Sequence, residues 1–557
     1  MKLRAPIGQS DFRRIREDRH TYVDKTTFVQ RVLDIPSVVL LFPRPRRFGK
    51  TLNLSTLRYF IERRPEDLSA IFEGLAVWHD PEARRHFQRY PVIFLTFKDL
   101  KFNDWATCRA GIARLVATAV GEQGDISGGL SEAQKADLKA LETEQADDAL
   151  LTDALRFLTS ILHTRTGERV AVLLDEYDTP IHAAFLHGYY GDAVGFFRNF
   201  LSAGFKDNNA LFKGVMTGIL RIAKENLFSG LNNLDVFGIL QDRFSDDFGF
   251  TDDEVADLAE LAGAEAELPT IRAWYNGYRF GPTTIYNPWS VLKFLSSPAS
   301  GPDAYWVATS ANDLLREVLL RGGLDHPADF EVLVSGGSVR RELDESLVLR
   351  DLYAQANAVW TLLLHSGYLT ATDVRSNDIG TREATLTIPN REVLGVYRSI
   401  FARWITTATG GPGPTRDLHR AILAGDAEQF ERILGHIMRD TLSFHDLDPR
   451  VPERVYHAFL AGLLVSLAPD YEVRSNRESG YGRYDVMILP RRPTDPGVVM
   501  ELKALDKETL ETARTKAQQQ LIDRQYAAEL RARGVQQIRG YVVVFDGKEA
   551  HVTTVDV

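Results

Sequence analysis

The chain has 557 residues, of which 44% are hydrophobic and 25% charged, and its formal net charge at pH 7 is −10. The apolar share is ordinary for a globular protein, so composition excludes intrinsic disorder and fibrous repeats as descriptions of the whole chain. The acidic balance excludes a globally basic nucleic-acid coat protein, although it leaves room for a local basic groove.

Cysteine content and hydropathy exclude further classes of protein. The single cysteine, Cys108, can form neither an intramolecular disulfide nor a thiolate zinc site. No apolar run is long enough to cross a bilayer, and the first residues contain no apolar stretch typical of a secretory signal. We therefore expect a cytoplasmic protein that makes no membrane contact.

Two clusters of turn residues divide the chain. Residues 296–302 collect Ser, Pro and Gly, which do not continue a helix. Residues 410–414 alternate Gly and Pro, a run that we expect to support neither a helix nor a sheet ladder. These breaks predict three domains, at residues 1–295, 303–410 and 415–557.

Before the first break, short apolar runs alternate with helix-like segments. The runs that indicate buried strands are residues 38–42, 92–97, 170–174 and 214–220. A helix is expected from Ser131, where Gln134 completes a capping box, and another from Thr251, where Glu254 does the same. This alternation predicts an α/β domain with a mostly parallel sheet and helices on both faces.

The first of these strands leads directly into a loop that ends in Gly49-Lys50-Thr51, followed by a helical pattern. At such a helix start, backbone N–H groups face an anion, the lysine reaches the β- and γ-phosphates, and the threonine hydroxyl can ligate Mg²⁺. Arg46 and Arg47 add positive charge to the loop. A basic turn after a buried strand is the alternative interpretation.

Acidic and polar residues also follow the later strands. Asp175 and Glu176 come at the end of the third strand, where a P-loop enzyme holds Mg²⁺ through one acid and positions the attacking water with the other. Thr217, near the end of the fourth strand, is a candidate for sensing the γ-phosphate, with a plain core strand as the alternative. Together, the two motifs favour nucleotide binding more strongly than they favour hydrolysis.

Longer motifs make this part of the chain resemble the bacterial AAA-ATPase-like family. They are Pro6-Ile7-Gly8, Tyr22-Val23-Asp24-Lys25, residues 44–51, residues 174–181, Thr217-Gly218-Ile219 and Trp274-Tyr275-Asn276-Gly277-Tyr278. In that family an arginine-rich loop replaces the glycine-rich one, so Arg44 fits the family pattern although the general motif has glycine at its position. The resemblance extends to about residue 290 and implies a P-loop fold with ATP as the nucleotide. It does not establish turnover.

Residues 303–410 show a mainly helical pattern with a strand candidate at 381–388. A small winged-helix unit is one option there, because residues 362–369 are followed by a strand-like stretch. After residue 414, helices precede a run of strands, one more helix and a last strand.

A predicted hairpin near the C-terminus gathers charged residues. Its strands are residues 482–490 and 498–503, and period-two alternation places Glu501 and Lys503 on one face, with Asp485 alongside. Two carboxylates can hold Mg²⁺ or Mn²⁺, and a lysine can help to orient a water for attack on phosphorus. The alternative is a solvated face, because Glu-x-Lys is common on exposed strands.

The Asp…Glu-x-Lys pattern, with the acids 16 positions apart, resembles the restriction-endonuclease-like, PD-(D/E)XK nucleases. Residues 477–485 are similar to the nuclease-like domain that accompanies AAA-ATPase-like modules. The resemblance implies an α/β nuclease fold and a further acid at Glu453, for which a solvated helix residue is the alternative. It also implies a polar contact from Gln519, although three adjacent glutamines leave the choice open.

The sequence therefore predicts an ATP-regulated, Mg²⁺-dependent nuclease whose substrate is nucleic acid, with DNA expected; a homo-oligomer stays open. The predicted catalytic residues are Asp485, Glu501, Lys503, Glu453, Gln519 and Glu176. The predicted nucleotide-binding residues are Arg46, Arg47, Gly49, Lys50, Thr51, Asp175 and Thr217, and the predicted metal ligands are Asp485, Glu501, Thr51 and Asp175. The alternatives are an ATP-gated protein that only binds nucleic acid or a partner, and an ATPase motor with a structural C-terminal domain.

Overall fold

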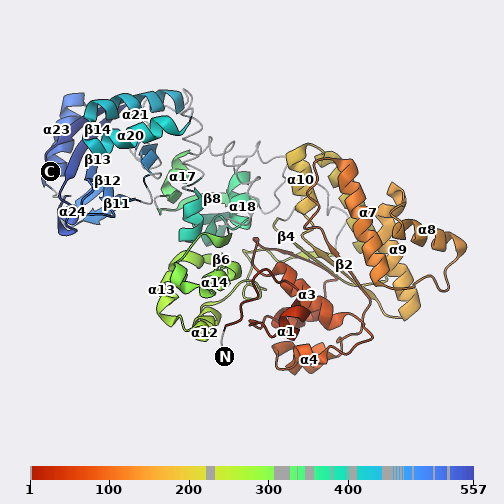
Figure 1. Ribbon diagram of the computed structural model, residues 1–557. Helices are drawn as coiled ribbons and strands as arrows, with labels where there is room; N and C mark the ends of the chain where they lie inside the picture. Colours follow the sequence, from red (N-terminus) through yellow and green to blue (C-terminus); the bar gives the residue numbers. More distant parts are fainter. Residues whose placement is uncertain are drawn as a thin grey trace. The chain divides into compact units, whose positions relative to one another are not determined.

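The computed structural model places the chain in two compact units (Figure 1). The first unit contains Met1–Gly322 and Arg340–Val393, and the second contains Gly323–Val339 and Leu394–Val557. The boundaries of the three predicted domains stay predictions. The residues that the structure describes are 3–220, 233–306, 327–334, 336–344, 357–377, 381–397, 399, 411–441, 456, 459–460, 463–464, 467, 470–479, 482–505, 508–523 and 527–557.

The first unit is built on a five-stranded parallel sheet. Its strands are β1 (Val39–Pro43), β2 (Val92–Thr96), β3 (Val170–Asp175), β4 (Leu211–Gly218) and β5 (Leu234–Val236). They lie in the order β2-β3-β4-β1-β5, and each neighbouring pair is parallel. Every residue of β1, β3 and β4 is buried, as expected of apolar strands covered on both faces. The predicted parallel α/β domain is confirmed.

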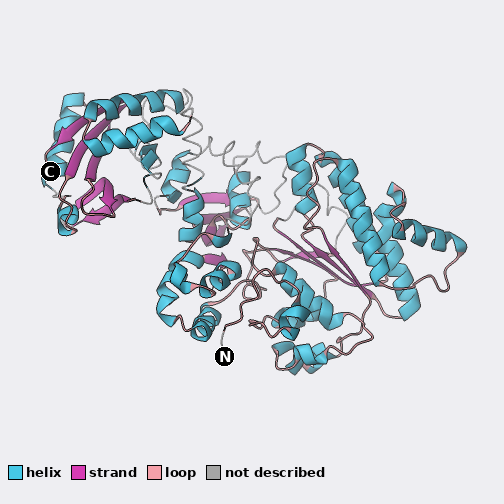
Figure 2. Ribbon diagram, in the orientation of Figure 1, coloured by secondary structure: helices cyan, strands magenta, loops and turns pink. Residues whose placement is uncertain are grey.

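Helices cover both faces of this sheet (Figure 2): α1 and α3 lie on one side, and α7, α9 and α10 on the other. Both predicted capping boxes are present, at Ser131 and Thr251. The helices of this part are α1 (Phe12–Glu17), α2 (Thr27–Asp34), α3 (Lys50–Ile61), α4 (Ser69–Phe72), α5 (Ala76–His79), α6 (Pro81–Arg84), α7 (Trp105–Glu122), α8 (Glu132–Glu142), α9 (Asp148–Thr166), α10 (Thr179–His187) and α11 (Tyr190–Phe205).

The first unit continues with short elements and a second, three-stranded sheet. α18 is buried along its whole length, and β9 and β10 follow it as an antiparallel pair, in keeping with the winged-helix option. β10 confirms the predicted strand at 381–388, whereas the sequence pattern did not predict β8. The elements are α12 (Asp252–Ala262), α13 (Leu268–Tyr275), β6 (Tyr278–Phe280), β7 (Thr283–Ile285), α14 (Pro288–Leu295), β8 (Val339–Leu343), α18 (Ala358–His365), β9 (Thr370–Ser376) and β10 (Arg382–Thr387), with 3-10 turns at Glu265–Glu267 and Pro298–Ser300.

The Trp-Tyr-Asn-Gly-Tyr motif holds a distant segment of the first unit in place. Gly277 has φ +93°, and a Cβ atom there would lie 2.1 Å from the carbonyl oxygen of Pro389, so only glycine fits. The Asn390 side-chain amide donates to the carbonyl oxygen of Asn276 at 2.7 Å. The motif is therefore a packing contact, which fixes the chain immediately before it passes into the second unit after Val393.

A buried carboxylate lies in the same segment and predicts a pH dependence of stability. Glu392 is fully buried and accepts hydrogen bonds from the Ser290 hydroxyl and the Trp306 backbone N–H. Burial raises the pKa of Glu392 from 4.5 to about 7. Because the folded state favours the protonated acid, its stabilising contribution is complete below pH 4.5 and is lost as the pH rises through about 7.

Replacing Glu392 by glutamine should remove that part of the pH dependence. We expect the free energy of unfolding of the wild type to fall by about 3 kcal/mol more than that of Glu392→Gln between pH 4.5 and pH 8. Urea unfolding at several pH values, followed by circular dichroism, measures the difference. Parallel pH profiles for the two proteins would contradict the assignment.

The second unit contains a mixed five-stranded sheet, in the order β11-β12-β13-β14-β15. The β12–β13 pair is antiparallel, as predicted for the hairpin, and β13–β14 is parallel. The last strand, β15, pairs antiparallel with β14 and was not predicted. The strands are β11 (Tyr471–Ser479), β12 (Gly482–Pro490), β13 (Gly497–Ala504), β14 (Ile538–Asp546) and β15 (Glu549–Val555).

Helices pack on both faces of this sheet, which gives it two hydrophobic cores. One core joins the sheet to α20 and α21, and the other joins it to α23 and α24. This arrangement confirms the predicted restriction-endonuclease-like α/β architecture. The described helices of the unit are α17 (Pro327–Val334), α20 (Pro412–Ala424), α21 (Ala427–Thr441), α23 (Leu510–Asp523) and α24 (Ala528–Ala532).

The Gly-Pro run at residues 410–414 corrects one prediction. α20 begins within it, at Pro412, with Gly411 as the N-cap residue. Proline is tolerated in the first turn of a helix because the N–H group it lacks has no intrahelical acceptor there. The expectation that this run supports no helix was therefore wrong for its last residues.

Within the part of the chain that the structure describes, none of the helices is both long and apolar enough to cross a membrane.

Candidate functional sites

The loop between β1 and α3 forms a compact turn around the side chain of Lys50. Gly49 has φ +84° and turns the chain into the helix, which begins at Lys50. The Lys50 ammonium folds back and donates to the carbonyl oxygens of Arg44 at 2.9 Å and Pro45 at 2.8 Å. The first N–H groups of α3 have no acceptor within the helix, so this end of α3 favours an anion.

The electrostatic surroundings of Lys50 also suit a negatively charged ligand. Burial lowers the pKa of Lys50, and the charges of Glu176, Asp178 and Asp175 partly offset that effect. A phosphate beside the ammonium would add negative charge and stabilise its protonated form.

Arg44 has a structural role in the loop. Its side chain is fully buried, and its guanidinium donates to the carbonyl oxygens of Pro43 at 2.9 Å, Phe237 at 2.5 Å and Phe244 at 3.0 Å. The same guanidinium lies 4.8 Å from the ring centroid of Phe248. Burial lowers the pKa of Arg44 to about 9. The arginine at the position of the usual glycine therefore ties the loop to residues 237–248.

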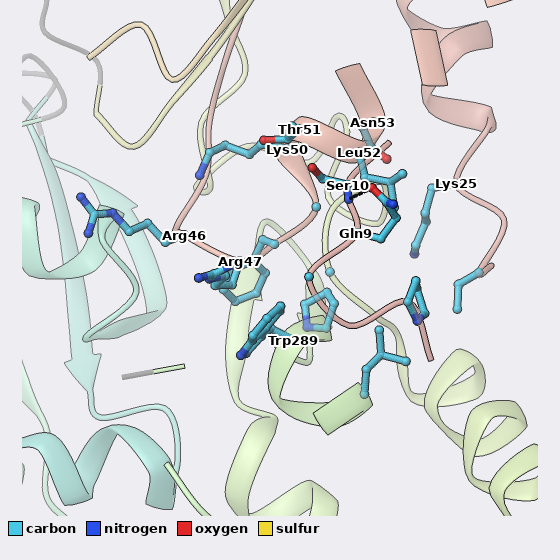
Figure 3. A pocket seen from close by; sticks show the side chains of 18 of the residues that line it. Gln9, Ser10, Lys25, Arg46, Arg47, Lys50, Thr51, Leu52, Asn53 and Trp289 are labelled. Atoms are coloured by element: carbon cyan, nitrogen blue, oxygen red, sulfur yellow. Dashed lines mark hydrogen bonds between the residues drawn. The ribbon is translucent and has the colours of Figure 1, made fainter. Parts of the chain in front are cut away.

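The two other arginines of the loop point in different directions (Figure 3). The Arg47 guanidinium lies over the ring of Trp289, 4.3 Å from its centroid. Arg46 extends away from Arg47 and Trp289. Both arginines line the same cavity as Lys50.

Asp175 brings together the ends of four elements. Its carboxylate accepts hydrogen bonds from the hydroxyls of Thr51 at 2.8 Å, Thr217 at 2.7 Å and Thr96 at 3.3 Å. The carboxylate is fully buried, and burial raises its pKa. The predicted Thr51–Asp175 pair thus meets in space, and its hydroxyl and carboxylate oxygens are of the kind that Mg²⁺ prefers. The residues present fit a nucleotide-bound magnesium ion.

The Asp-Glu-Tyr-Asp motif and the Thr-Gly-Ile motif form one contact. Glu176 has φ +52°, and its backbone N–H donates to the Thr217 hydroxyl at 3.3 Å. The Asp178 carboxylate accepts from the backbone N–H groups of Ile219 at 2.7 Å and Leu220 at 3.0 Å. A Cβ atom at Gly218 would lie 2.6 Å from the ring of Tyr177, so glycine is required there. The acidic strand end and the end of β4 are therefore held in one geometry.

A cavity of about 470 Å³ opens beside the loop. Its lining includes residues 46–53 and Glu176, together with Lys98 and Lys101, which the sequence reasoning missed. These lysines follow β2, and ligands of open parallel sheets bind at the carboxyl ends of the strands, a signal that could have found them. Elsewhere the cavity is lined by Pro6, Gly8, Gln9, Ser10, Thr21, Tyr22, Val23, Lys25, Asp99, Asp247, Gly249, Phe250, Pro288, Trp289 and Leu292.

In the second unit, the hairpin places three charged residues on one face of the sheet. Asp485, Glu501 and Lys503 alternate in phase with Met487 and Val499, which are buried in the core beneath α23. The Asp485 carboxylate accepts from the backbone N–H of Leu502, the residue between Glu501 and Lys503, at 2.8 Å. The Lys503 ammonium donates to Glu501 at 3.1 Å, and Glu501 is only 2% exposed.

The three residues can act chemically as one group. Two carboxylates on adjacent strands can share a divalent cation with water completing its shell, and the Lys503 ammonium pairs with one of them. Among the residues that the structure describes, no cluster of three or more His, Cys, Asp or Glu side chains could hold a metal. The protein ligands of a cation here would be Asp485 and Glu501, and these donors fit Mg²⁺ or Mn²⁺.

The other two predicted nuclease residues have different outcomes. Glu453 lies outside the described residues. The Gln519 side chain is exposed and donates to Asp523 at 2.6 Å, on the outer surface of α23. The side-chain oxygen of Gln520 is buried and accepts no hydrogen bond from any described residue. α23 packs on β13 and β14. Of the two glutamines, Gln520 has the buried side-chain oxygen, and the predicted role of Gln519 stays a prediction.

Two family models match parts of the chain. Residues 6–228 match the family model described as predicted AAA-ATPase, and residues 451–555 match the model of the PD-(D/E)XK nuclease superfamily. The chain carries an AAA-ATPase-like domain and a PD-(D/E)XK nuclease superfamily domain. The AAA-ATPase-like domain includes the whole Lys50 loop, Asp175 and Thr217, and the nuclease superfamily domain includes the charged hairpin.

The chain is also similar to another protein over nearly its whole length. The chain is 29% identical over 544 residues to a protein of Azotobacter chroococcum mcd 1 described as "Uncharacterized protein in vnfD 5'region". The match covers 96% of this chain and 95% of that protein. The AAA-ATPase-like and nuclease superfamily domains thus lie within a region of similarity that also includes the middle of the chain.

Proposed function

We propose that the protein is an ATP-regulated, divalent-metal-dependent nuclease that cleaves phosphodiester bonds in DNA. The observation that carries the proposal is the grouping of Asp485, Glu501 and Lys503 on one face of the hairpin, through the 2.8 Å and 3.1 Å hydrogen bonds. Two carboxylates can hold a divalent cation beside a phosphodiester, and a lysine can orient the attacking water.

The roles at the hairpin follow from its geometry. Asp485 and Glu501 would hold a divalent cation, which supplies Lewis-acid stabilisation of charge on the phosphate when bound. Lys503 donates to Glu501 and has further N–H groups that can orient a water or contact a phosphate oxygen. Water attacks phosphorus as the bond to the leaving oxygen breaks, the water loses a proton to solvent, and the leaving oxygen takes one up. Lys503 stabilises the negative charge that develops on the phosphate.

The AAA-ATPase-like domain supplies the regulation. The helix start at Lys50, the Thr51–Asp175 pair and the cationic side chains of the cavity favour a polyphosphate. Tyr22, Phe250 and Leu292 also line the cavity and offer apolar surface for a nucleobase. ATP is the nucleotide that the family resemblance implies.

Incubation of labelled DNA with the full chain tests the proposal. We expect products only when Mg²⁺ or Mn²⁺ is present, at a rate that changes when ATP is added. Equal cleavage rates with and without ATP would contradict the proposed regulation by ATP. Cleavage of RNA but not of DNA would show that the substrate is RNA. If ATP and DNA both bind but no metal yields a product, the protein is an ATP-gated binding protein.

The two glutamines of α23 provide a matched pair of variants. Gln520→Ala should lower the cleavage rate about tenfold, as expected for a polar residue that supports a metal site, because its side-chain oxygen is buried. Gln519→Ala removes an exposed side chain from the same helix and should leave the rate within about twofold. Initial rates at saturating Mn²⁺ measure both effects. A larger loss in Gln519→Ala would reinstate Gln519 as the site residue.

A further inference from the structure

Arg47 occupies an unusual backbone conformation in the phosphate loop. Its φ is +68°, in the left-handed region that residues other than glycine rarely adopt. The side chain is exposed to the cavity, and the guanidinium carbon lies 4.3 Å from the centroid of the Trp289 ring. Figure 3 shows the two side chains next to each other. The loop thus presents a cation whose position is set by an aromatic ring from α14.

Trp289 is itself held firmly at the start of that helix. The Asn287 side chain caps α14 by accepting from the backbone N–H of Ser290 at 3.2 Å, and the Asn287 backbone N–H donates to Tyr275 at 3.0 Å. The Ser290 hydroxyl donates to the buried carboxylate of Glu392 at 2.9 Å. The chain is fixed on both sides of Trp289, so the ring is a rigid platform.

The charges around the loop would displace Arg47 if it had no such platform. Arg46 and Glu176 both act electrostatically on Arg47, the first repelling and the second attracting it. Cationic groups outnumber carboxylates around the cavity, so a mobile guanidinium would move toward solvent. The cations that line it are Lys25, Arg46, Arg47, Lys50, Lys98 and Lys101, and the carboxylates are Asp99, Glu176 and Asp247.

Stacking leaves the guanidinium able to bind an anion. A guanidinium that lies flat on a ring keeps its N–H groups in its own plane, where they form a fork that matches phosphate oxygens. At an exposed site such a stack changes an equilibrium constant by about two- to fivefold, enough to orient the side chain without trapping it.

We propose that Trp289 is the positioning residue for Arg47, and that the stacked guanidinium binds the polyphosphate of the nucleotide. The inference rests on the proposed nucleotide binding. Trp289 affects ATP affinity only by positioning Arg47. Any direct contact between its ring and the ligand adds nothing to the affinity.

A double-mutant cycle of ATP affinity tests this role. Dissociation constants for ATP with Mg²⁺ are measured by titration calorimetry for the wild type, Trp289→Leu, Arg47→Gln and the double variant. We expect Arg47→Gln to weaken ATP binding about 20-fold and Trp289→Leu about fivefold. In the Arg47→Gln background, Trp289→Leu should have almost no further effect, because the cation it positions is gone. Trp289→Phe keeps an aromatic face and should stay within twofold of the wild type.

A tryptophan in a similar pair outside the cavity serves as the control. The Arg84 guanidinium lies over Trp78 at 6.0 Å, and Trp78→Leu should leave ATP affinity unchanged. An equal fivefold loss from Trp289→Leu with and without Arg47 would overturn the inference, because the ring would then contact the ligand or support the fold directly. If the wild type binds no ATP, the proposed nucleotide function fails as well, which is a distinct result.

Discussion

Replacing Glu501 by glutamine is expected to abolish DNA cleavage while the second unit stays folded. The Glu501 carboxylate is 2% exposed, and the amide is the same size but carries no charge to hold a divalent cation. We expect the cleavage rate with Mn²⁺ to fall at least about 10³-fold, because the barrier loses the stabilisation that the cation supplies. Initial rates on labelled DNA measure the loss.

The control for this variant is an exposed carboxylate on the same sheet. Glu549 lies at the start of β15, and Glu549→Gln should cleave at the wild-type rate. Circular dichroism should show the same secondary structure for both variants. Cleavage by Glu501→Gln at the wild-type rate would rule out the hairpin as the catalytic site.

Replacing Lys50 by methionine is expected to remove ATP binding. In the proposed function the ammonium contacts the β- and γ-phosphates in place of the carbonyl oxygens of Arg44 and Pro45, and methionine has a side chain of similar length without charge or donor groups. We expect the dissociation constant for ATP to rise at least about 100-fold, which corresponds to about 2.7 kcal/mol. Titration calorimetry with ATP and Mg²⁺ provides the measurement.

A second buried lysine of the same sheet separates loss of binding from loss of fold. Lys213 on β4 is buried and donates to the carbonyl oxygens of Ile35 and Ser37, much as Lys50 donates to the loop. It does not line the cavity. Lys213→Met should destabilise the first unit but keep ATP affinity. Equal loss of affinity in both variants would mean that Lys50 acts through the fold.

The sequence pattern was sufficient for the parts of the fold set by local rules. β1, and β3 up to Asp175 at its end, are continuous apolar runs, and a sheet covered on both faces accommodates them. The two capping boxes mark helix starts because they satisfy backbone N–H groups within four residues. In the hairpin, strict alternation places Glu501 and Lys503 on one face whatever the rest of the fold does.

Long-range packing accounts for what the pattern did not show. Nothing local to Arg44 indicates that its guanidinium binds carbonyl groups about two hundred residues away, at Phe237 and Phe244. Trp289 enters the cavity lining through the docking of α14, which hydropathy does not reveal. Three adjacent glutamines have the same local signal, and only the packing of α23 distinguishes Gln520 from Gln519. The sequence analysis did not predict β15, which begins only three residues after β14 ends and pairs antiparallel with it.

The two sites lie in different units of one chain, and the nuclease proposal depends on the second. The hydrogen bonds from Leu502 to Asp485 and from Lys503 to Glu501 hold that charged group in place. Buried charges destabilise a fold unless they are paired or bind a ligand, so the arrangement fits the proposed metal site, and an ion pair with a structural role is its alternative.

The most direct measurement is anomalous diffraction from a crystal soaked in Mn²⁺. We expect a manganese peak at the hairpin, within coordination distance of both the Asp485 and the Glu501 carboxylates, and no such peak in Glu501→Gln. A soaked crystal in which manganese binds elsewhere while those two carboxylates remain without it would contradict the proposed nuclease site.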